Sequence, residues 1–229
     1  MVLADERRPT TSAICLRKAP GRLSASGSSD GPNGLAVAHL DVTDTTEIRQ
    51  VVNKAFADLG KIDVVINNAG YGLFGAAEEL SNEKILHQID TNLIGSIQLV
   101  RASLPHLRKQ GGGRIIQLST YGGQATHPGA SLYHASKWGI EGFMESVMKE
   151  VAPCNIGITL VEPGGARTNF RFGSSQLAQR MAAYDGTPAS NDSRNLGCIA
   201  PFTRRSCEDG EDNHRERRAE SSTEQNRPG

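Results

Sequence analysis

The sequence lacks an excess of charge of either sign and lacks any long apolar run. Lys plus Arg and Asp plus Glu each number 25 among 229 residues, so the formal net charge is zero. Without a basic surface, or basic residues interleaved with aromatics, we expect no nucleic acid among the partners. No run reaches the ~18 apolar residues of a membrane span, and the N-terminus lacks the apolar core of a signal peptide. We therefore expect a soluble, cytoplasmic protein with no membrane partner.

Paired cysteines are also missing. The four cysteines are Cys15, Cys154, Cys198 and Cys207, and no two of them stand at a short spacing. This scatter argues against zinc ligation and against a disulfide framework, so we expect reduced thiols and no metal site. A chain of this length with about a third of its residues apolar fits one globular domain with a sizeable core.

Both ends of the chain lack a regular hydrophobic pattern. Residues 1–34 are irregular, with prolines and a Gly/Ser-rich stretch around one short apolar run, residues 13–16, which predicts a strand. Residues 187–229 are polar, and no large apolar residue follows Phe202. Such a tail cannot offset its ordering entropy by burial, so we expect disorder over about 189–229. The remaining residues, 35–186, form the predicted core.

The first part of this core reads as a strand, a helix and a second strand. Residues 35–40 predict a strand, and Thr43 or Asp44 would cap a helix that ends at Gly60. Residues 62–66 are β-branched and too short for a helix, so they predict a buried strand parallel to the previous one. The helix is indicated by apolar residues at helical spacing: Ile48, Val51, Val52, Ala55, Phe56 and Leu59.

The same alternation continues along the chain. Ser81 would cap a long helix that closes at Pro105 and the glycines 111–113, and residues 114–118 and 156–161 predict two further strands around a helix from Tyr133 to Pro153. Strands alternating with helices predict an α/β fold with a doubly wound parallel sheet covered on both faces. In such sheets ligands bind at the carboxyl ends of the strands.

Tyr133 and Lys137 stand four residues apart on the predicted helix, and therefore share one face. A cation beside a phenol favours the ionised form and can lower the phenol pKa toward the working range, which suits proton transfer. A Tyr and a Lys at this spacing are also common on amphipathic helices that do no chemistry, so the pair needs support from other residues.

That support comes from several motifs in one order. The sequence carries Asp41-Val42, Asn67-Asn68-Ala69-Gly70, Asn92, the hydroxyl pair Ser119-Thr120 before a glycine turn, Tyr133 with Lys137, and Pro163-Gly164 with Thr168 nearby. Over about residues 35–170 the chain therefore resembles the short-chain dehydrogenase/reductase family, whose sheet is Rossmann-like. The resemblance implies an NAD(P)-dependent oxidoreductase that interconverts a ketone or aldehyde and an alcohol.

The resemblance also implies roles for individual residues. Tyr133 would be the general acid or base, Lys137 would lower its pKa and bind the nicotinamide ribose, and Asn92 would support a proton-relay water. The family's catalytic Ser usually lies thirteen residues before the Tyr, where this chain has Thr120. A Thr hydroxyl can still polarise a carbonyl, and Ser119 remains the alternative.

For the cofactor, the resemblance implies contacts along one edge of the sheet. Arg17 and Lys18 follow the first predicted strand, where basic residues suit a 2′-phosphate, so NADP(H) is favoured over NAD(H). Family members often form dimers or tetramers, so a homo-oligomer is possible. The implied cofactor-binding residues are Arg17, Asp41, Val42, Asn68, Ala69, Gly70, Tyr133, Lys137, Pro163, Gly164, Ala166 and Thr168.

The chain departs from the family at both ends. The family begins with a strand and a glycine-rich loop that binds the pyrophosphate, whereas residues 1–12 contain no glycine. Either these residues form a strand of their own, or the run at 13–16 moves inward, or the sheet keeps a gap with unpaired edges. The family's last helix and strand are replaced by the polar tail. An alternative function is therefore a truncated, catalytically impaired fragment that acts as a binding or regulatory protein, or a nucleotide sensor without turnover.

Overall fold

The computed structural model describes residues 2–4, 11–17, 35–164, 170 and 174–190, all within one compact unit, Met1–Leu196. The second unit, Gly197–Gly229, lies outside the described residues. Of the disorder expected over about 189–229, only Ala189 and Ser190 are described; they are helical, and Ser190 is buried. In the described part of the chain, no helix has the length and apolar character to cross a membrane.

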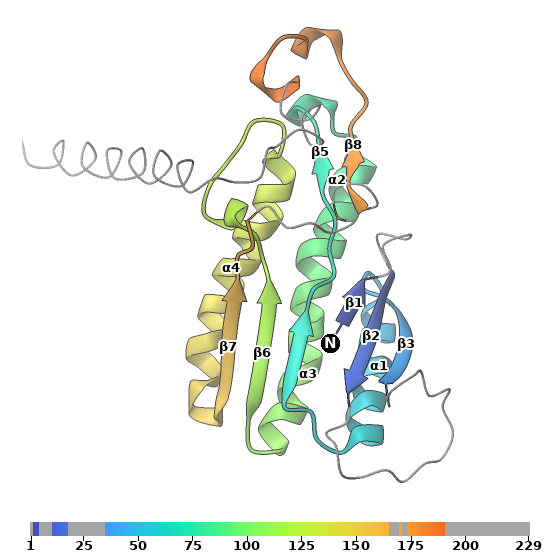
Figure 1. The fold of residues 1–229 in the computed structure, drawn as a ribbon, viewed down its shortest axis with the longest axis vertical. Coiled ribbons are helices and arrows are strands. Elements are labelled where there is room, and N and C mark those ends of the chain that lie inside the picture. Colours follow the sequence, from blue (N-terminus) through green and yellow to red (C-terminus); the bar gives the residue numbers. More distant parts are fainter. Residues whose placement is uncertain (1, 5–10, 18–34, 165–169, 171–173, 191–229) are drawn as a thin grey trace, which may run out of the picture. The chain divides into compact units, whose positions relative to one another are not determined.

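A parallel sheet forms the centre of this unit (Figure 1). Its strands are β4 (Val64–Asn67), β6 (Gly113–Leu118) and β7 (Ile156–Val161), in the order β4-β6-β7. The register places Val65 beside Ile115 and Ile115 beside Ile158, so these side chains point to the same face of the sheet. The predicted α/β class with a parallel sheet is confirmed.

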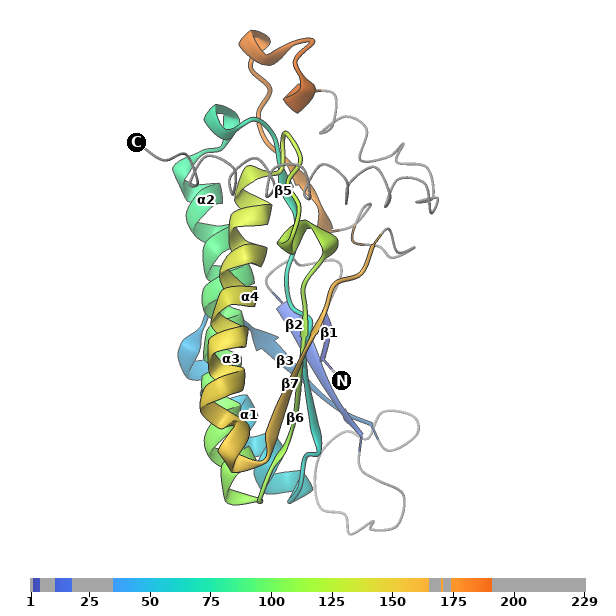
Figure 2. The same ribbon diagram turned by 90° about the vertical axis from the view of Figure 1, so that its left-hand side faces the viewer.

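The long helices pack on one face of this sheet (Figure 2). They are α1 (Thr45–Leu59), α3 (Gly95–Lys109) and α4 (Ser131–Val151). The crossovers through α3 and α4 step in the same direction across the sheet, and right-handed crossovers then place both helices on one side. Among the residues that the structure describes, no helix covers the other face of the sheet. Val64 and Val161 on that face are 40% and 36% exposed.

The hydrophobic core lies between this sheet and the three helices. Ile115 of β6 is fully buried, and Ile140 and Met144 of α4 pack in the same cluster. Helix α1 joins the core by packing against α3. Phe56 of α1 stacks in parallel on His106 of α3, with the ring centroids 4.5 Å apart. The core therefore unites the layers that carry the site residues.

An antiparallel sheet precedes this parallel one. Its strands are β1 (Val2–Ala4), β2 (Thr11–Arg17) and β3 (Leu35–Asp41), in the order β1-β2-β3. The strand predicted at 62–66 has its described ladder with β6 and not with β3, which pairs antiparallel with β2. Parallel pairing needs a long crossover, usually a helix, and residues 18–34 contain no apolar helical repeat.

Residues 1–12 take the first of the alternatives left open by the sequence. The strand β1 pairs with β2 through Val2 to Ile14 and Ala4 to Ser12, and it lies next to β4. It does not replace the family's first parallel strand, since no ladder joins it to β4 within the described residues. Leu40 at the end of β3 is fully buried in the common core, so this sheet is attached through β3 and α1.

The ends of the helices follow the sequence signals in all but one case. Asp44 caps α1 by accepting from the Thr46 and Glu47 amides at 2.7 and 3.0 Å, and Gly60 ends it at φ 73°. The predicted helix end at Pro105 is wrong, since Pro105 lies inside α3, which runs on to Lys109. Proline removes only one helical hydrogen bond, and the fully buried Leu107 keeps the last turn in the core.

The helix that begins after Ser81 is interrupted in its middle. Ser81 accepts a hydrogen bond from the Lys84 amide at 3.3 Å and caps α2 (Asn82–Ile89). A π-helical turn, η2 (Asp90–Ile94), then connects α2 to α3 and carries Asn92. Such turns hold one extra residue and are frequent at functional sites.

Smaller elements complete the unit beyond the carboxyl end of the parallel sheet. Strand β5 (Leu73–Phe74) pairs in parallel with β8 (Gln176–Leu177). The short helices η1 (Ala77–Glu79), η3 (Tyr121–Gly123) and η6 (Ala182–Tyr184) belong to this part. A further short helix, η4 (Ala152–Cys154), joins α4 to the start of β7. Tyr184 Oη donates to Glu78 Oε2 at 2.9 Å, which ties the segment after β8 to η1.

Candidate active site

The carboxyl ends of β4 and β6 and the first two turns of α4 bring the predicted catalytic side chains together. Thr120 follows β6, and its hydroxyl lies near enough to the Tyr133 phenol to lower the pKa of that phenol. Ser119 instead donates its hydroxyl hydrogen to Glu141. Of the two candidate hydroxyls, the structure therefore places that of Thr120, and not that of Ser119, against Tyr133.

Asn92 ties three segments of the site to one another. Its Oδ1 accepts from the Tyr71 amide at 3.0 Å, and its Nδ2 donates to the Tyr71 carbonyl at 2.8 Å and to Ser136 Oγ at 3.2 Å. Ser136 in turn donates to the Tyr133 carbonyl at 2.7 Å. The side chain is only 1% exposed, so the π-helical turn holds it between the loop after β4 and the helix of Tyr133.

Lys137 is buried next to the same loop. Its ammonium donates to the Leu118 carbonyl at 3.0 Å, and a Cβ on Gly70 would lie 3.8 Å from Nζ and 3.1 Å from Asn92 Oδ1. The backbone at Gly70 can therefore lie close to both Lys137 and Asn92, because glycine has no side chain there. Burial lowers the pKa of Lys137 to about 8, while the charge of Glu141 acts in the opposite direction.

The phenol of Tyr133 lies in an apolar environment. Its ring centroid is 5.7 Å from that of Phe74 and 5.8 Å from that of Phe170. Burial raises the pKa of Tyr133 to about 12, against a smaller lowering by the Thr120 hydroxyl. The role of Lys137 in lowering this pKa stays a prediction: Nζ is 5.9 Å from the ring centroid, and burial is the largest influence on the pKa of Tyr133.

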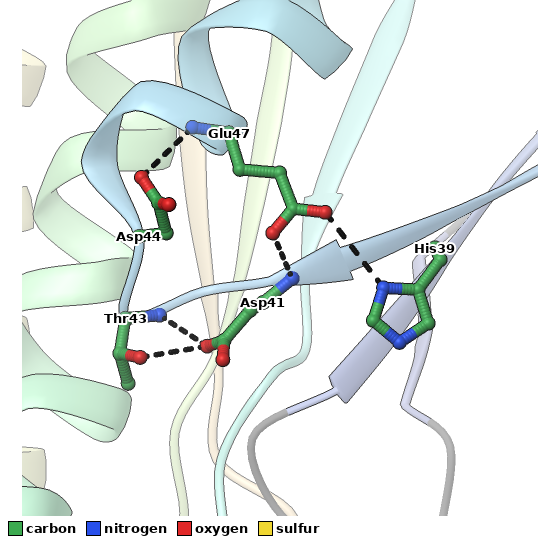
Figure 3. Close-up of polar contacts among 5 residues, drawn as sticks. All are labelled: His39, Asp41, Thr43, Asp44 and Glu47. Atoms are coloured by element: carbon green, nitrogen blue, oxygen red, sulfur yellow. Dashed lines mark hydrogen bonds and ion pairs between the residues drawn. The ribbon is translucent and has the colours of Figure 1, made fainter.

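Asp41 lies at the carboxyl end of β3, where it organises its own turn (Figure 3). Its Oδ1 accepts from the Thr43 amide at 2.9 Å and from the Thr43 hydroxyl at 2.7 Å. Glu47 accepts from the Asp41 amide at 3.0 Å and forms an ion pair of 3.7 Å with His39. Val42, predicted to flank the adenine, is only 2% exposed and belongs to the core.

The other predicted cofactor residues do not all lie on this edge, because Arg17 pairs with Leu35 at the end of the antiparallel sheet opposite Asp41. Asn68 is exposed at the end of β4, whereas Ala69 is buried. Pro163 accepts from the Tyr121 amide at 3.3 Å through its carbonyl, and a Cβ on Gly164 would meet no atom within 4 Å. The backbone of Arg17 ends β2. Ala166 and Thr168 lie outside the described residues, as does Lys18.

The residues fit one end of a nicotinamide cofactor better than the other. At the Tyr133 end, the buried Lys137 ammonium and the glycine approach at Gly70 provide a cation and an uncrowded backbone. At the phosphate end, the sequence has no glycine-rich loop. The fit therefore rests on the residues around α4.

Two buried titratable side chains of α4 were missed in the sequence. His134 accepts from the His127 amide at 3.1 Å through Nε2, and its Nδ1 lies 2.7 Å from the Gly122 carbonyl, which assigns the proton to Nδ1. Glu141 is 3% exposed and accepts hydrogen bonds from Ser119 and Gln124. A signal existed, since Glu141 falls on the apolar face with Ile140 and Met144, where an ionisable residue needs a partner.

Comparison with known proteins covers most of the described chain. The sequence model of short chain dehydrogenases matches residues 16–177. "Oxidoreductase BOA17" of Botryotinia fuckeliana is 37% identical over 176 residues, 77% of this chain and 64% of that protein. The 3-ketodihydrosphingosine reductase of Bacteroides thetaiotaomicron is 40% identical over 131 residues, 57% of this chain and 49% of that one. The chain thus spans about half to two thirds of the length of these relatives.

Solved structures give the same answer. A short-chain dehydrogenase from Streptomyces avermitilis superposes with a TM-score of 0.65 at 34% identity, over 72% of this chain and 60% of that one. ElxO with NADP bound reaches 0.53 at 32% identity, covering 55% and 51%. NAD+-bound xylitol dehydrogenase reaches 0.55 at 27% identity, covering 58% and 52%. The motifs, the parallel sheet and these likenesses agree: the chain belongs to the short-chain dehydrogenase family.

Proposed function

We propose that the chain is an NAD(P)-dependent oxidoreductase that interconverts a ketone or aldehyde and an alcohol, with Tyr133 as the general acid or base. The observation that carries this proposal is the contact of the Thr120 hydroxyl with the Tyr133 phenol, one helical turn before the buried ammonium of Lys137. A hydroxyl beside a phenol can orient a carbonyl oxygen for proton transfer.

The direction of proton transfer follows from the charge state of Tyr133. With its pKa raised to about 12, the phenol is protonated at neutral pH, so it donates a proton to a carbonyl oxygen as that oxygen becomes a hydroxyl. The nicotinamide supplies the hydride when bound. Lys137 would bind the ribose of the cofactor, and Asn92 would fix the loop at Tyr71 against α4.

The rings beside Tyr133 support an apolar substituent on the substrate carbonyl. Phe74 is 9% exposed and Phe170 is half-buried, and both rings lie within 6 Å of the Tyr133 ring centroid. For the cofactor, we retain the preference for NADP(H) over NAD(H), which rests on Arg17 and Lys18 in the sequence. ElxO was solved with NADP and xylitol dehydrogenase with NAD+.

The second candidate is a binding or regulatory protein without turnover. It is favoured by the missing glycine-rich loop and by the antiparallel pairing of β2 and β3. In this case the acid-base residues would be retained without a cofactor cradle.

Titration of the purified chain with NADPH, followed by fluorescence, separates these candidates. The enzyme predicts saturable binding, and Tyr133→Phe should keep this binding while carbonyl reduction falls by about 10²-fold or more. Absence of saturable binding up to about 1 mM NADPH would contradict the enzyme, because the binding free energy would then be weaker than about −4 kcal/mol. Saturable binding without turnover in the unaltered chain would favour the nucleotide sensor.

A further inference from the structure

We propose that Glu141, one turn after Lys137 on α4, is a positioning residue whose buried carboxylate keeps the Lys137 ammonium charged in the working enzyme. The family motifs on which the proposed function rests leave this side chain without a role. The inference deepens that function, because the charge on Lys137 matters only if Lys137 serves Tyr133 and the cofactor. Its experiment is chosen to give an answer even for a chain without turnover.

The carboxylate of Glu141 is fixed by groups from two other segments. Oε1 accepts from the Ser119 hydroxyl at the end of β6, and Oε2 accepts from the side-chain amide of Gln124 after η3. The carboxylate also lies directly against Gly123, where an added Cβ would be 1.7 Å from Oε1. Glu141 therefore occupies one place beneath the loop that presents Thr120.

Neither hydrogen-bond partner cancels the charge of this carboxylate. Ser119 and Gln124 are neutral, and a buried carboxylate is costly without a cation nearby. The other charged groups around it, Glu145 on the next turn of α4 and Glu162 after β7, are exposed carboxylates that repel it. The cation that balances it is the buried Lys137 ammonium, 6% exposed, whose own hydrogen bond goes to the Leu118 carbonyl.

The charge of Glu141 in turn affects the pKa of Lys137. Burial pulls the pKa of Lys137 down to about 8, close to the pH at which an enzyme works, and the Glu141 charge is the factor that raises it. Without that charge the ammonium would lose its proton at a lower pH. Lys137 would then be a neutral amine for much of the pH range in which Tyr133 is expected to transfer protons.

The test measures the titration of Lys137 directly. In protein labelled with ¹³C-lysine, the Lys137 Cε resonance is followed by NMR from pH 6 to 11, with assignment by Lys137→Arg. Glu141→Gln removes the charge but retains a side chain that can bond Ser119 and Gln124. We expect its Lys137 midpoint to fall by about one pH unit relative to the unaltered chain. Where turnover is present, the alkaline limb of the kcat/KM profile should fall by a similar amount.

Matched variants separate charge from structure. Glu145→Gln removes an exposed carboxylate from the same helix, and Gln124→Ala removes a hydrogen bond without a charge, so both should leave the Lys137 midpoint within about 0.3 unit. An unchanged midpoint in Glu141→Gln overturns the proposal, as does an equal fall in Gln124→Ala. If Glu141→Gln does not fold, Glu141→Asp decides: it keeps the charge, so it must keep the midpoint, and a fall of about one unit overturns the proposal. A chain without turnover defeats the proposed function while the NMR result still stands for or against Glu141.

Discussion

In the parallel sheet, β4 and β6 are each followed by a helix that packs back against the sheet, whereas in the antiparallel sheet β3 is the only strand followed by a helix within the described residues. At the carboxyl edge of the parallel sheet, Thr120 lies against Tyr133 of α4, and Lys137 of the same helix donates to the Leu118 carbonyl. The antiparallel sheet carries Asp41, whose carboxylate is engaged by its neighbour Thr43. The acid-base residues thus depend on long-range packing, whereas the conformation at Asp41 depends on a local turn.

The largest expected effect tests whether the two sheets share one core. Ile115 of β6 and Leu40 of β3 are both fully buried in the same cluster. Ile115→Ala and Leu40→Ala should each lower the free energy of unfolding by about 3–4 kcal/mol, as measured by urea denaturation. A cost below about 1 kcal/mol for Leu40→Ala alone would mean that the antiparallel sheet packs separately.

The next effect tests whether the two edges differ in chemistry. Thr120→Val removes the hydroxyl that contacts Tyr133, and should lower the rate of carbonyl reduction by about 10²-fold at saturating cofactor, whereas Thr120→Ser should retain most of it. Thr43→Val removes a hydroxyl from the Asp41 turn and should change the rate by less than about threefold. Equal losses at both positions would contradict the separation of roles.

A third prediction concerns how closely Gly123 of η3 packs against Glu141 of α4. Gly123→Ala would place a methyl group against Glu141 and Ser119, and should lower the free energy of unfolding by about 2 kcal/mol. Gly142→Ala adds the same methyl group on α4 where no atom lies within 4 Å, and should raise it by about 0.5–1 kcal/mol. Thermal unfolding of the two variants in parallel measures the contrast, and a neutral Gly123→Ala would show that the loop yields.

The smallest expected effect is a dependence of stability on pH. Burial lowers the pKa of His134, so below about pH 6.5 the unfolded chain binds the proton that the folded chain refuses. The contribution of His134 is therefore fully present above pH 6.5 and is lost as the pH falls toward 5. The Tm of His134→Gln should fall less steeply over this range than that of the unaltered chain.

The sequence predicted the elements whose pattern is local. Strands β4, β6 and β7 and helices α1 and α4 lie close to their predicted positions, because β-branched runs and helical spacing of apolar residues determine them. The Tyr133 to Lys137 spacing and the N-cap at Asp44 were equally readable. The choice between Ser119 and Thr120 was left open, since two adjacent hydroxyls at a strand end differ only in the direction that the pleat gives them.

What could not be predicted depends on contacts far apart in the chain. The antiparallel pairing of β2 and β3 is a choice between partners that strand propensity does not specify. The raised pKa of Tyr133 depends on rings from β5 and from residue 170, and the partners of Glu141 come from β6 and from the loop after η3. Sequence spacing on one helix cannot show such neighbours.

The π-helical turn at Asp90–Ile94 has a consequence for insertions and deletions. Its extra residue rotates everything that follows by about 100° about the helix axis, one residue's share of a turn. Deleting one residue between Asn92 and Gly95 would make the helix regular but would break the alignment of Asn92 with the buried face of α3. The regular helix would have better backbone hydrogen bonds but would no longer hold Asn92 in place. A one-codon deletion, which is usually mild in an exposed helix, would here remove the hydrogen bonds by which Asn92 joins Tyr71 to Ser136.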